Sequence, residues 1–202
     1  MNYFVTAIGT DSGKTLVSAI LCEALEADYW KPIQAGTPRD SDTVKRLISN
    51  TKTRILPEAY ALRTPASPHA AARKENSEIS LRNCHPVQQS STLVIEGAGG
   101  CLVPINDQDF VINIAENMNA KIILVSNLYL GSINHTLLTA HFLKSKNLSV
   151  KGIVFNGPPN EESERIILHH TQYPCLLRIQ QETEITPEVV KKYASMLKEN
   201  WK

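Results

Sequence analysis

The sequence predicts a doubly wound α/β domain, in which helices cover both faces of a mostly parallel sheet. Short runs rich in β-branched and aromatic residues recur along the chain, and segments with helical spacing separate them. Several of these runs are apolar throughout, which is typical of strands that are buried on both faces. These two observations together favour a three-layer arrangement.

The expected elements follow one another along the chain. The predicted strands lie at residues 3–8, 27–33, 92–96, 121–127, 150–156 and 174–179. Helical spacing and length predict helices at residues 14–26, 131–146 and 186–200. Between Ile55 and Arg73 the prolines predict a long excursion, whose length suggests a functional loop. Because the sequence has neither a repeat nor a linker-like segment, we expect residues 1–202 to form one domain.

The composition favours a small-molecule substrate over a macromolecular partner. The chain has 21 Lys and Arg residues against 20 Asp and Glu residues, which leaves no strong field for nucleic acid or an anionic membrane surface. The sequence shows neither a signal-peptide pattern nor an apolar stretch of membrane-spanning length. Its four cysteines lack the spacing of a metal site or a disulfide framework. We therefore expect a cytoplasmic protein that binds neither nucleic acid nor membrane.

The strongest motif is GTDSGKT at residues 9–15, which lies between the first predicted strand and a predicted helix. This context indicates a phosphate-binding loop of the P-loop NTPase type, where backbone N–H groups and a helix N-terminus meet an anion. Gly13 would let the backbone approach the phosphates, Lys14 would neutralise phosphate oxygens, and Thr15 would bind Mg²⁺. These residue types predict nucleotide binding.

The loop is a variant of the common pattern, because Ile8 stands where the first glycine is expected. The alternative to nucleotide binding is an ordinary glycine-rich turn. In that case Asp11 or Ser12 would cap the following helix.

Two carboxylates and a second lysine are expected near this loop. Glu96 ends a predicted strand directly before four small residues, at the sheet edge where open α/β sheets bind ligands. Asp42 begins a predicted helix and is the candidate for a second carboxylate ligand of Mg²⁺, the alternative being a helix cap or first-turn acid. Lys31 precedes a proline that breaks its strand, and it would add a cation beside Lys14 unless it is a solvated surface lysine.

Four segments together resemble the dethiobiotin synthetases. These segments are VTAIGTDSGKT, KPIQAG, IEGAGG with the following VPI, and LGSINHTLLTA, and they are supported by ASPHAAA near residue 70 and FNG at 155–157. The resemblance covers most of the chain. It implies an enzyme that uses ATP, Mg²⁺ and CO₂ to convert 7,8-diaminononanoate into dethiobiotin, ADP and phosphate. The N7 amine would form a carbamate, the carbamate would attack the γ-phosphoryl group, and the N8 amine would close the ureido ring on the mixed anhydride.

The resemblance also implies roles for individual residues. Lys31 and Lys14 would be catalytic, and Thr15, Asp42 and Glu96 would hold the metal. The implied ATP-binding residues are Asp11, Ser12, Gly13, Lys14, Thr15, Leu16, Asp42, Glu96, Gly97, Ala98, Gly99, Asn156 and Gly157. The implied substrate contacts are Ala35, Thr37, Gly131, Ser132 and Asn134. Because the family binds the substrate carboxylate with the helix start at Gly131 of the partner subunit, a homodimer is implied.

Asn156 would read the adenine, unless it closes a turn before Gly157. His69 and His135 lie in helical-looking segments and are left out of catalysis. The chain departs from the family pattern at Ala7, at Ala35, where a serine is usual, and at residues 177–180, which leaves the base selectivity open. Thr37 would replace the lost serine hydroxyl.

Two other functions remain open from the sequence. One is a related P-loop amide-forming synthase, which would normally need an ammonia source. The other is a ParA-like ATPase switch, which should show a basic patch or an amphipathic tail. The lysine-containing segment 186–202 is the feature that would serve the second function, although a terminal helix packed on the sheet explains it more simply.

Overall fold

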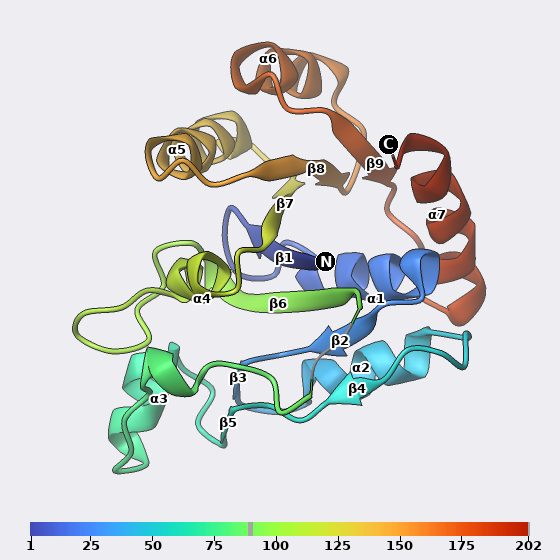
Figure 1. The fold of residues 1–202 in the computed structure, drawn as a ribbon. Helices are drawn as coiled ribbons and strands as arrows, with labels where there is room; N and C mark the ends of the chain where they lie inside the picture. The colour runs from blue at the N-terminus through green and yellow to red at the C-terminus, as the bar shows by residue number, and fades with distance from the viewer. Residues whose placement is uncertain (89–90, 202) are drawn as a thin grey trace.

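The computed structural model describes residues 1–88 and 91–201, so Lys202, the last residue of the predicted domain, lies outside the described residues. Within these ranges the main sheet has seven strands in the order β4-β2-β6-β1-β7-β8-β9, and every neighbouring pair is parallel (Figure 1). The strands are β1 Asn2–Ala7, β2 Asp28–Trp30, β4 Ile55–Leu56, β6 Leu93–Gly100, β7 Lys121–Asn127, β8 Val150–Asn156 and β9 Cys175–Ile179. The predicted α/β fold with a parallel sheet is confirmed.

Helices cover both faces of this sheet (Figure 1). One apolar core contains residues of α1 (Lys14–Leu25), α2 (Asp40–Leu47) and α7 (Pro187–Asn200). The core on the other face contains residues of the remaining helices, which are α3 Pro68–Lys74, α4 Val111–Asn117, α5 Ser132–Ser145 and α6 Glu161–Thr171. A short 3₁₀ helix spans Leu81–Asn83. None of the described helices combines the length and the apolar character needed to cross a membrane.

The alternation of side chains along β1 explains why its sequence is apolar on both faces. Tyr3, Val5 and Ala7 belong to the core that faces α1, whereas Phe4 belongs to the core on the opposite face. Each of these side chains is at most 6% exposed, so neither face of the strand meets water. A continuous apolar run is therefore the expected sequence of this central parallel strand.

The strand order places the predicted functional segments beside one another. β6 lies between β2 and β1, with Tyr29 paired to Val94 and Val5 paired to Glu96. Parallel strands have their carboxyl ends at the same edge of the sheet. The loop after β1, the residue after β2 and the last half of β6 therefore meet at one edge.

Three local expectations differ from the structure. The predicted strand 27–33 is two strands, β2 and β3 (Ile33–Ala35), because Pro32 between them has no N–H group for the ladder. β3 pairs with β5 (Tyr60–Leu62) in a separate two-stranded sheet, so the segment 55–73 contains strands and most of α3 and is more than a loop. Residues 97–100 continue β6, whereas a loop directly after Glu96 was expected.

Candidate active site

The loop between β1 and α1 has the backbone of an anion-binding turn. Asp11 and Gly13 have positive φ angles of 55° and 93°, and Gly13 is the N-cap of α1 without a side-chain cap. The first N–H groups of the helix are therefore available to a ligand. Lys14 Nζ donates to the Gly9 carbonyl at 3.1 Å, and Ser12 Oγ donates to the same carbonyl at 3.2 Å. These bonds close the loop around its own backbone.

Asn156, at the end of β8, makes a hydrogen bond to the backbone of this loop. Its Nδ2 donates to the Ser12 carbonyl at 3.0 Å. A Cβ atom on Gly13 would lie 2.3 Å from the same Nδ2, so this position requires glycine for two reasons, its positive φ and the close approach. The family resemblance implies that Asn156 reads the adenine, and its hydrogen bond to the loop is a contact that the sequence did not suggest.

Glu96 is the most connected group of the site. It is 1% exposed. Oε1 accepts hydrogen bonds from Thr15 Oγ1 at 2.8 Å and Lys31 Nζ at 3.1 Å, and Oε2 accepts one from the Tyr29 hydroxyl at 2.9 Å. A buried carboxylate is costly unless it is paired and hydrogen-bonded, and these donors meet that requirement. Burial, and then the charge of Glu96, raise the pKa of Tyr29 well above its usual value, so its hydroxyl remains a donor.

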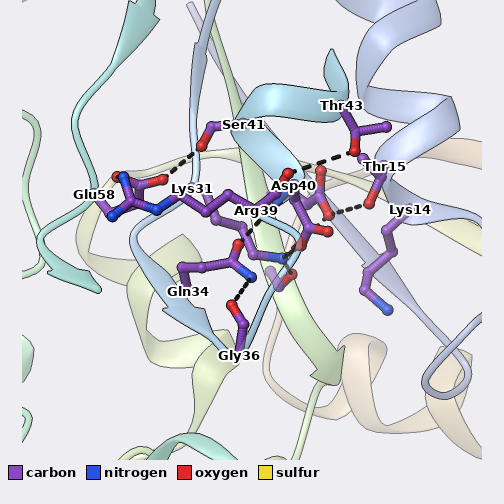
Figure 2. Close-up of polar contacts among 12 residues, drawn as sticks. Lys14, Thr15, Lys31, Gln34, Gly36, Arg39, Asp40, Ser41, Thr43 and Glu58 are labelled. Carbon is purple, nitrogen blue, oxygen red and sulfur yellow. Dashed lines mark hydrogen bonds and ion pairs between the residues drawn. The ribbon is translucent and has the colours of Figure 1, made fainter. Parts of the chain in front are cut away.

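Lys31 is buried among acceptors. Besides Glu96, its Nζ contacts Asp40 Oδ2 at 2.7 Å (Figure 2). It also donates to the Gly97 carbonyl at 2.8 Å. Burial alone would lower the pKa of Lys31, but the negative charges of Glu96 and Asp40 outweigh it and raise the pKa above its usual value. Lys31 is thus a charged ammonium at the sheet edge and not the solvated surface lysine of the alternative.

Hydrogen bonds at the start of α2 direct Asp40 towards Lys31. The backbone N–H of Asp40 donates to Gln34 Oε1 at 3.1 Å, while Gln34 Nε2 donates to the Gly36 carbonyl at 3.2 Å (Figure 2). On the next residue of the helix, Ser41 Oγ donates to Glu58 Oε1 at 2.5 Å. Residues from β3 and from the segment before β5 therefore fix the first turn of α2.

The pKa of Lys14 is shifted in the opposite direction to the pKa of Lys31. Lys14 is 7% exposed, and within residues 1–88 and 91–201 its Nζ contacts the Gly9 carbonyl and no carboxylate. Burial and the positive charge of Lys31 lower the pKa of Lys14 to about 8, although more distant carboxylates partly oppose this shift. A bound phosphate would therefore supply a negative charge close to the Lys14 ammonium.

A cleft of about 720 Å³ opens over these groups. Its walls come from the loop after β1, the segment from Lys31 to Asp40, residues 65–68 and the end of β6. The predicted site residues that line it are Asp11, Gly13, Lys14, Thr15, Lys31, Ala35, Thr37, Glu96, Ala98 and Gly99. Of the remaining residues that were predicted around the phosphates, Ser12 and Gly97 are buried and Leu16 packs against the core beside α1.

Other predicted residues lie away from the cleft lining. Asp42 is an exposed acid of the first turn of α2, and Asp40, two positions earlier, lines the cleft instead. Gly131, Ser132 and Asn134 lie at the start of α5, and Asn156 with Gly157 lies behind the phosphate loop. His69 and His135, which were left out of catalysis, are also absent from the lining of this cleft.

The sequence did not single out Asp40, Gln34 or Tyr29. The two acids in Asp40-Ser41-Asp42 were the available signal for Asp40. Choosing between them requires knowing which side of α2 faces the cleft. Tyr29 lies in β2 and Lys31 directly follows that strand, so an extended backbone puts both side chains on one face, and this spacing of two is the signal that could have found Tyr29.

The oxygen atoms of this site suit a magnesium ion. Thr15, Glu96 and Asp40 present a hydroxyl and two carboxylates in one cleft, and hard oxygen ligands are those that Mg²⁺ prefers. Among residues 1–88 and 91–201, no group of three or more His, Cys, Asp or Glu side chains could hold a metal ion. A divalent ion at this place would therefore complete its coordination with the hydroxyl, phosphate oxygens and water.

Known proteins resemble this chain over nearly its whole length. A family model described as an AAA domain matches residues 1–189. The ATP-dependent dethiobiotin synthetase of Cytophaga hutchinsonii is 60% identical over 201 residues, which cover 98% of each chain. The enzymes of the same name from Christiangramia forsetii and Agrobacterium fabrum are 45% and 42% identical, and the matches cover 96% and 94% of this chain and 94% and 91% of theirs.

Solved structures with a similar fold have much less similar sequences. A ParA family ATPase from Chlorobium tepidum aligns with a TM-score of 0.63 and 13% identity, over 98% of this chain and 94% of its own. The septum site-determining protein MinD of Pyrococcus horikoshii, complexed with Mg-ADP, aligns with a TM-score of 0.58 and 15% identity, over 100% and 93% of the two chains. At such identities the likeness shows the fold alone.

The lowered pKa of Lys14 predicts a pH-dependent affinity for nucleotide phosphates. A bound phosphate restores negative charge beside the ammonium and favours its protonated form, so binding takes up a proton once the pH exceeds about 8. We expect the affinity for ADP, measured by calorimetry, to fall roughly tenfold between about pH 7.5 and about pH 9.5. A Lys14→Met variant should bind more weakly and lose most of this dependence. Equal pH profiles for both proteins would contradict the assignment.

Proposed function

This chain belongs to the ATP-dependent dethiobiotin synthetases, and from this premise we propose that the cleft closes the ureido ring of dethiobiotin on 7,8-diaminononanoate. CO₂ and ATP are the other substrates, and ADP and phosphate are the further products. The observation that carries this function is the convergence of the phosphate loop, Lys31 and Glu96 on one cleft. One wall can hold the nucleotide phosphates, and the buried cation beside it can hold the anion that attacks them.

Mg²⁺ would be held by Thr15, Glu96 and one carboxylate of α2. When bound, the ion supplies positive charge to the β- and γ-phosphate oxygens. The geometry supports Asp40 for the α2 ligand, because its Oδ2 lies 2.7 Å from Lys31 Nζ inside the cleft. The resemblance implies Asp42, which is exposed on the same helical turn. Asp42 stays a prediction that substitution can decide.

Lys31 would act on the carbamate that forms when the N7 amine captures CO₂. Its ammonium is held at the cleft by Asp40, Glu96 and Gly97, and metal ligation by the carboxylates would free hydrogens of Nζ for a new anion. The carbamate oxygen would then attack the γ-phosphoryl group in line, with Lys14 and the N–H groups of α1 holding the transferred charge. The N8 amine would attack the resulting carbamic-phosphoric anhydride, which closes the ring and releases phosphate.

The remaining contacts follow the same arrangement. Ala35 and Thr37 line the cleft beside Lys31 and would face the diamine, with the Thr37 hydroxyl in the role of the usual serine. For the base, Asn156 would use its free Oδ1 towards the adenine amino group while its Nδ2 holds the phosphate loop, with Gly157 beside it. Dependence on ATP fits a cytoplasmic location.

A homodimer would supply the contact for the substrate carboxylate. Gly131, Ser132 and Asn134 lie at the N-terminal end of α5, away from the lining of their own cleft. A second cavity of about 390 Å³, lined in part by Leu102 and Leu138, shares Thr10 and Val103 with the catalytic cleft. Leu102 and Leu138 are 53% and 61% exposed, which suits a face that a second copy covers. Pairing across this face would bring the partner's α5 close to the cleft.

The reaction itself can be tested with isotope. The purified protein is incubated with 7,8-diaminononanoate, MgATP and labelled bicarbonate, and acid-stable label in dethiobiotin is measured with released ADP and phosphate. We expect one labelled product for each ADP. ATP hydrolysis without label incorporation would contradict the ring-closing function and favour an ATPase switch.

Substitution of single acids on α2 decides which carboxylate serves the metal. We expect Asp40→Asn to lower turnover by about a hundredfold at limiting Mg²⁺ and to recover partly at high Mg²⁺, because one ligand is lost. The matched change Asp42→Asn should leave turnover within about twofold, because exposed acids of a first helical turn contribute little. The reverse pattern would assign the metal to Asp42.

The dimer face can be tested by one charge. Leu138→Glu places a carboxylate in the proposed interface, so light scattering should show a shift from dimer to monomer. The KM for 7,8-diaminononanoate should rise at least about tenfold while ADP affinity is unchanged, because only the substrate carboxylate is bound by the partner. Met196→Glu, on α7, is the control and should remain dimeric. A monomeric unaltered protein with full activity would contradict this arrangement.

A further inference from the structure

Tyr29 is a polar residue of the site that neither the phosphate loop nor the KPIQAG segment accounts for. It lies in β2 and is 0% exposed, packed in the core that faces α1. Its hydroxyl donates to Glu96 Oε2 at 2.9 Å. A phenylalanine would fill the same apolar space, and a buried hydroxyl costs free energy unless it is paired. Packing alone therefore does not explain the hydroxyl, and its contact with Glu96 is the remaining explanation.

The sheet explains why this tyrosine reaches that carboxylate. Tyr29 pairs with Val94 on the neighbouring parallel strand, and Glu96 follows Val94 on the same face. Lys31 follows Tyr29 on the same face and reaches the other oxygen of Glu96. Trp30, between them, points to the opposite core, where its Nε1 donates to the Pro57 carbonyl at 3.0 Å. β2 and the residue that follows it thus present two donors to one carboxylate.

The two oxygens of Glu96 differ in their surroundings. Oε1 meets Thr15 and Lys31, both of which line the cleft. Oε2 meets Tyr29, which does not line it. If the metal–nucleotide complex and the carbamate bind as proposed above, the Thr15 hydroxyl turns to the metal and Lys31 turns to the carbamate. The Tyr29 hydroxyl keeps its hydrogen bond to Glu96, because the tyrosine ring is packed in the core and does not face the cleft.

From this geometry we infer that Tyr29 is a positioning residue for the metal site: its hydroxyl fixes Oε2 so that Oε1 faces the metal and the β- and γ-phosphates. This inference rests on the proposed function, because it takes Glu96 as a ligand of Mg²⁺. Partners that orient a metal ligand typically change metal affinity by about 10–100-fold when they are removed. Without the hydroxyl, Oε2 is buried without its donor, and the carboxylate turns away from the metal to satisfy it.

The experiment compares nucleotide binding with and without metal. ADP affinity is measured by calorimetry in Mg²⁺ and in EDTA, and the ratio of the two affinities is the gain from magnesium. For Tyr29→Phe we expect this gain to fall about tenfold while the affinity in EDTA stays within about twofold. Tyr3→Phe removes the hydroxyl of another buried strand tyrosine, which contacts Met1 Sδ and not Glu96, and it should keep the full gain.

The same substitution in a Glu96→Gln protein separates an effect of Tyr29 on Glu96 from a general disturbance of the site. If Tyr29 acts through Glu96, then Tyr29→Phe should not reduce the gain further in a Glu96→Gln protein. An unchanged gain in the single variant, or an equal loss of affinity in Mg²⁺ and EDTA, overturns the inference while the proposed function stands. If the unaltered protein shows no gain from magnesium, the proposed metal site and the inference fall together.

Discussion

The arrangement of the site depends on one buried carboxylate. Glu96 lies in the central part of the sheet with 1% exposure, and a charge in that position must be paired. Its donors come from α1, from the residue after β2 and from within β2. Each donor lies at least 65 residues before Glu96 in the chain. The long-range contacts that pair the Glu96 carboxylate are therefore the contacts that assemble the phosphate site.

The strand order makes this possible. β6 lies between β2 and β1, so Glu96 has the phosphate loop on one side and Lys31 on the other. Pro32 ends the ladder of β2 and lets the following segment leave towards β5. The donors to Glu96 also differ in their surroundings. Thr15 and Lys31 line the cleft, whereas Tyr29 is packed in the core. A ligand in the cleft can therefore replace the contacts of Thr15 and Lys31 with Glu96 while the hydrogen bond from Tyr29 remains.

The sequence anticipates the parts of the site that are coded locally. The fold, the phosphate loop and the positions of Lys31 and Glu96 follow from apolar runs, a strand-to-helix motif and the rule that parallel strands end at one edge. Three features were beyond such patterns. The choice between Asp40 and Asp42 depends on the rotation of α2, which Gln34 and Glu58 determine through contacts made in space. The contact of Tyr29 with Glu96 and the hydrogen bond from Asn156 to Ser12 depend on strand pairing, which a single sequence does not specify.

The most direct measurement is the coupling free energy between Lys31 and Glu96. Unfolding free energies of Lys31→Met, Glu96→Gln and the double variant would be compared with that of the unaltered protein in a double-mutant cycle. If the buried pair organises the site, each single change leaves a charge with fewer partners, and the coupling should be about 1–3 kcal/mol. Additive effects, with a coupling below about 0.5 kcal/mol, would contradict the central role given to Glu96.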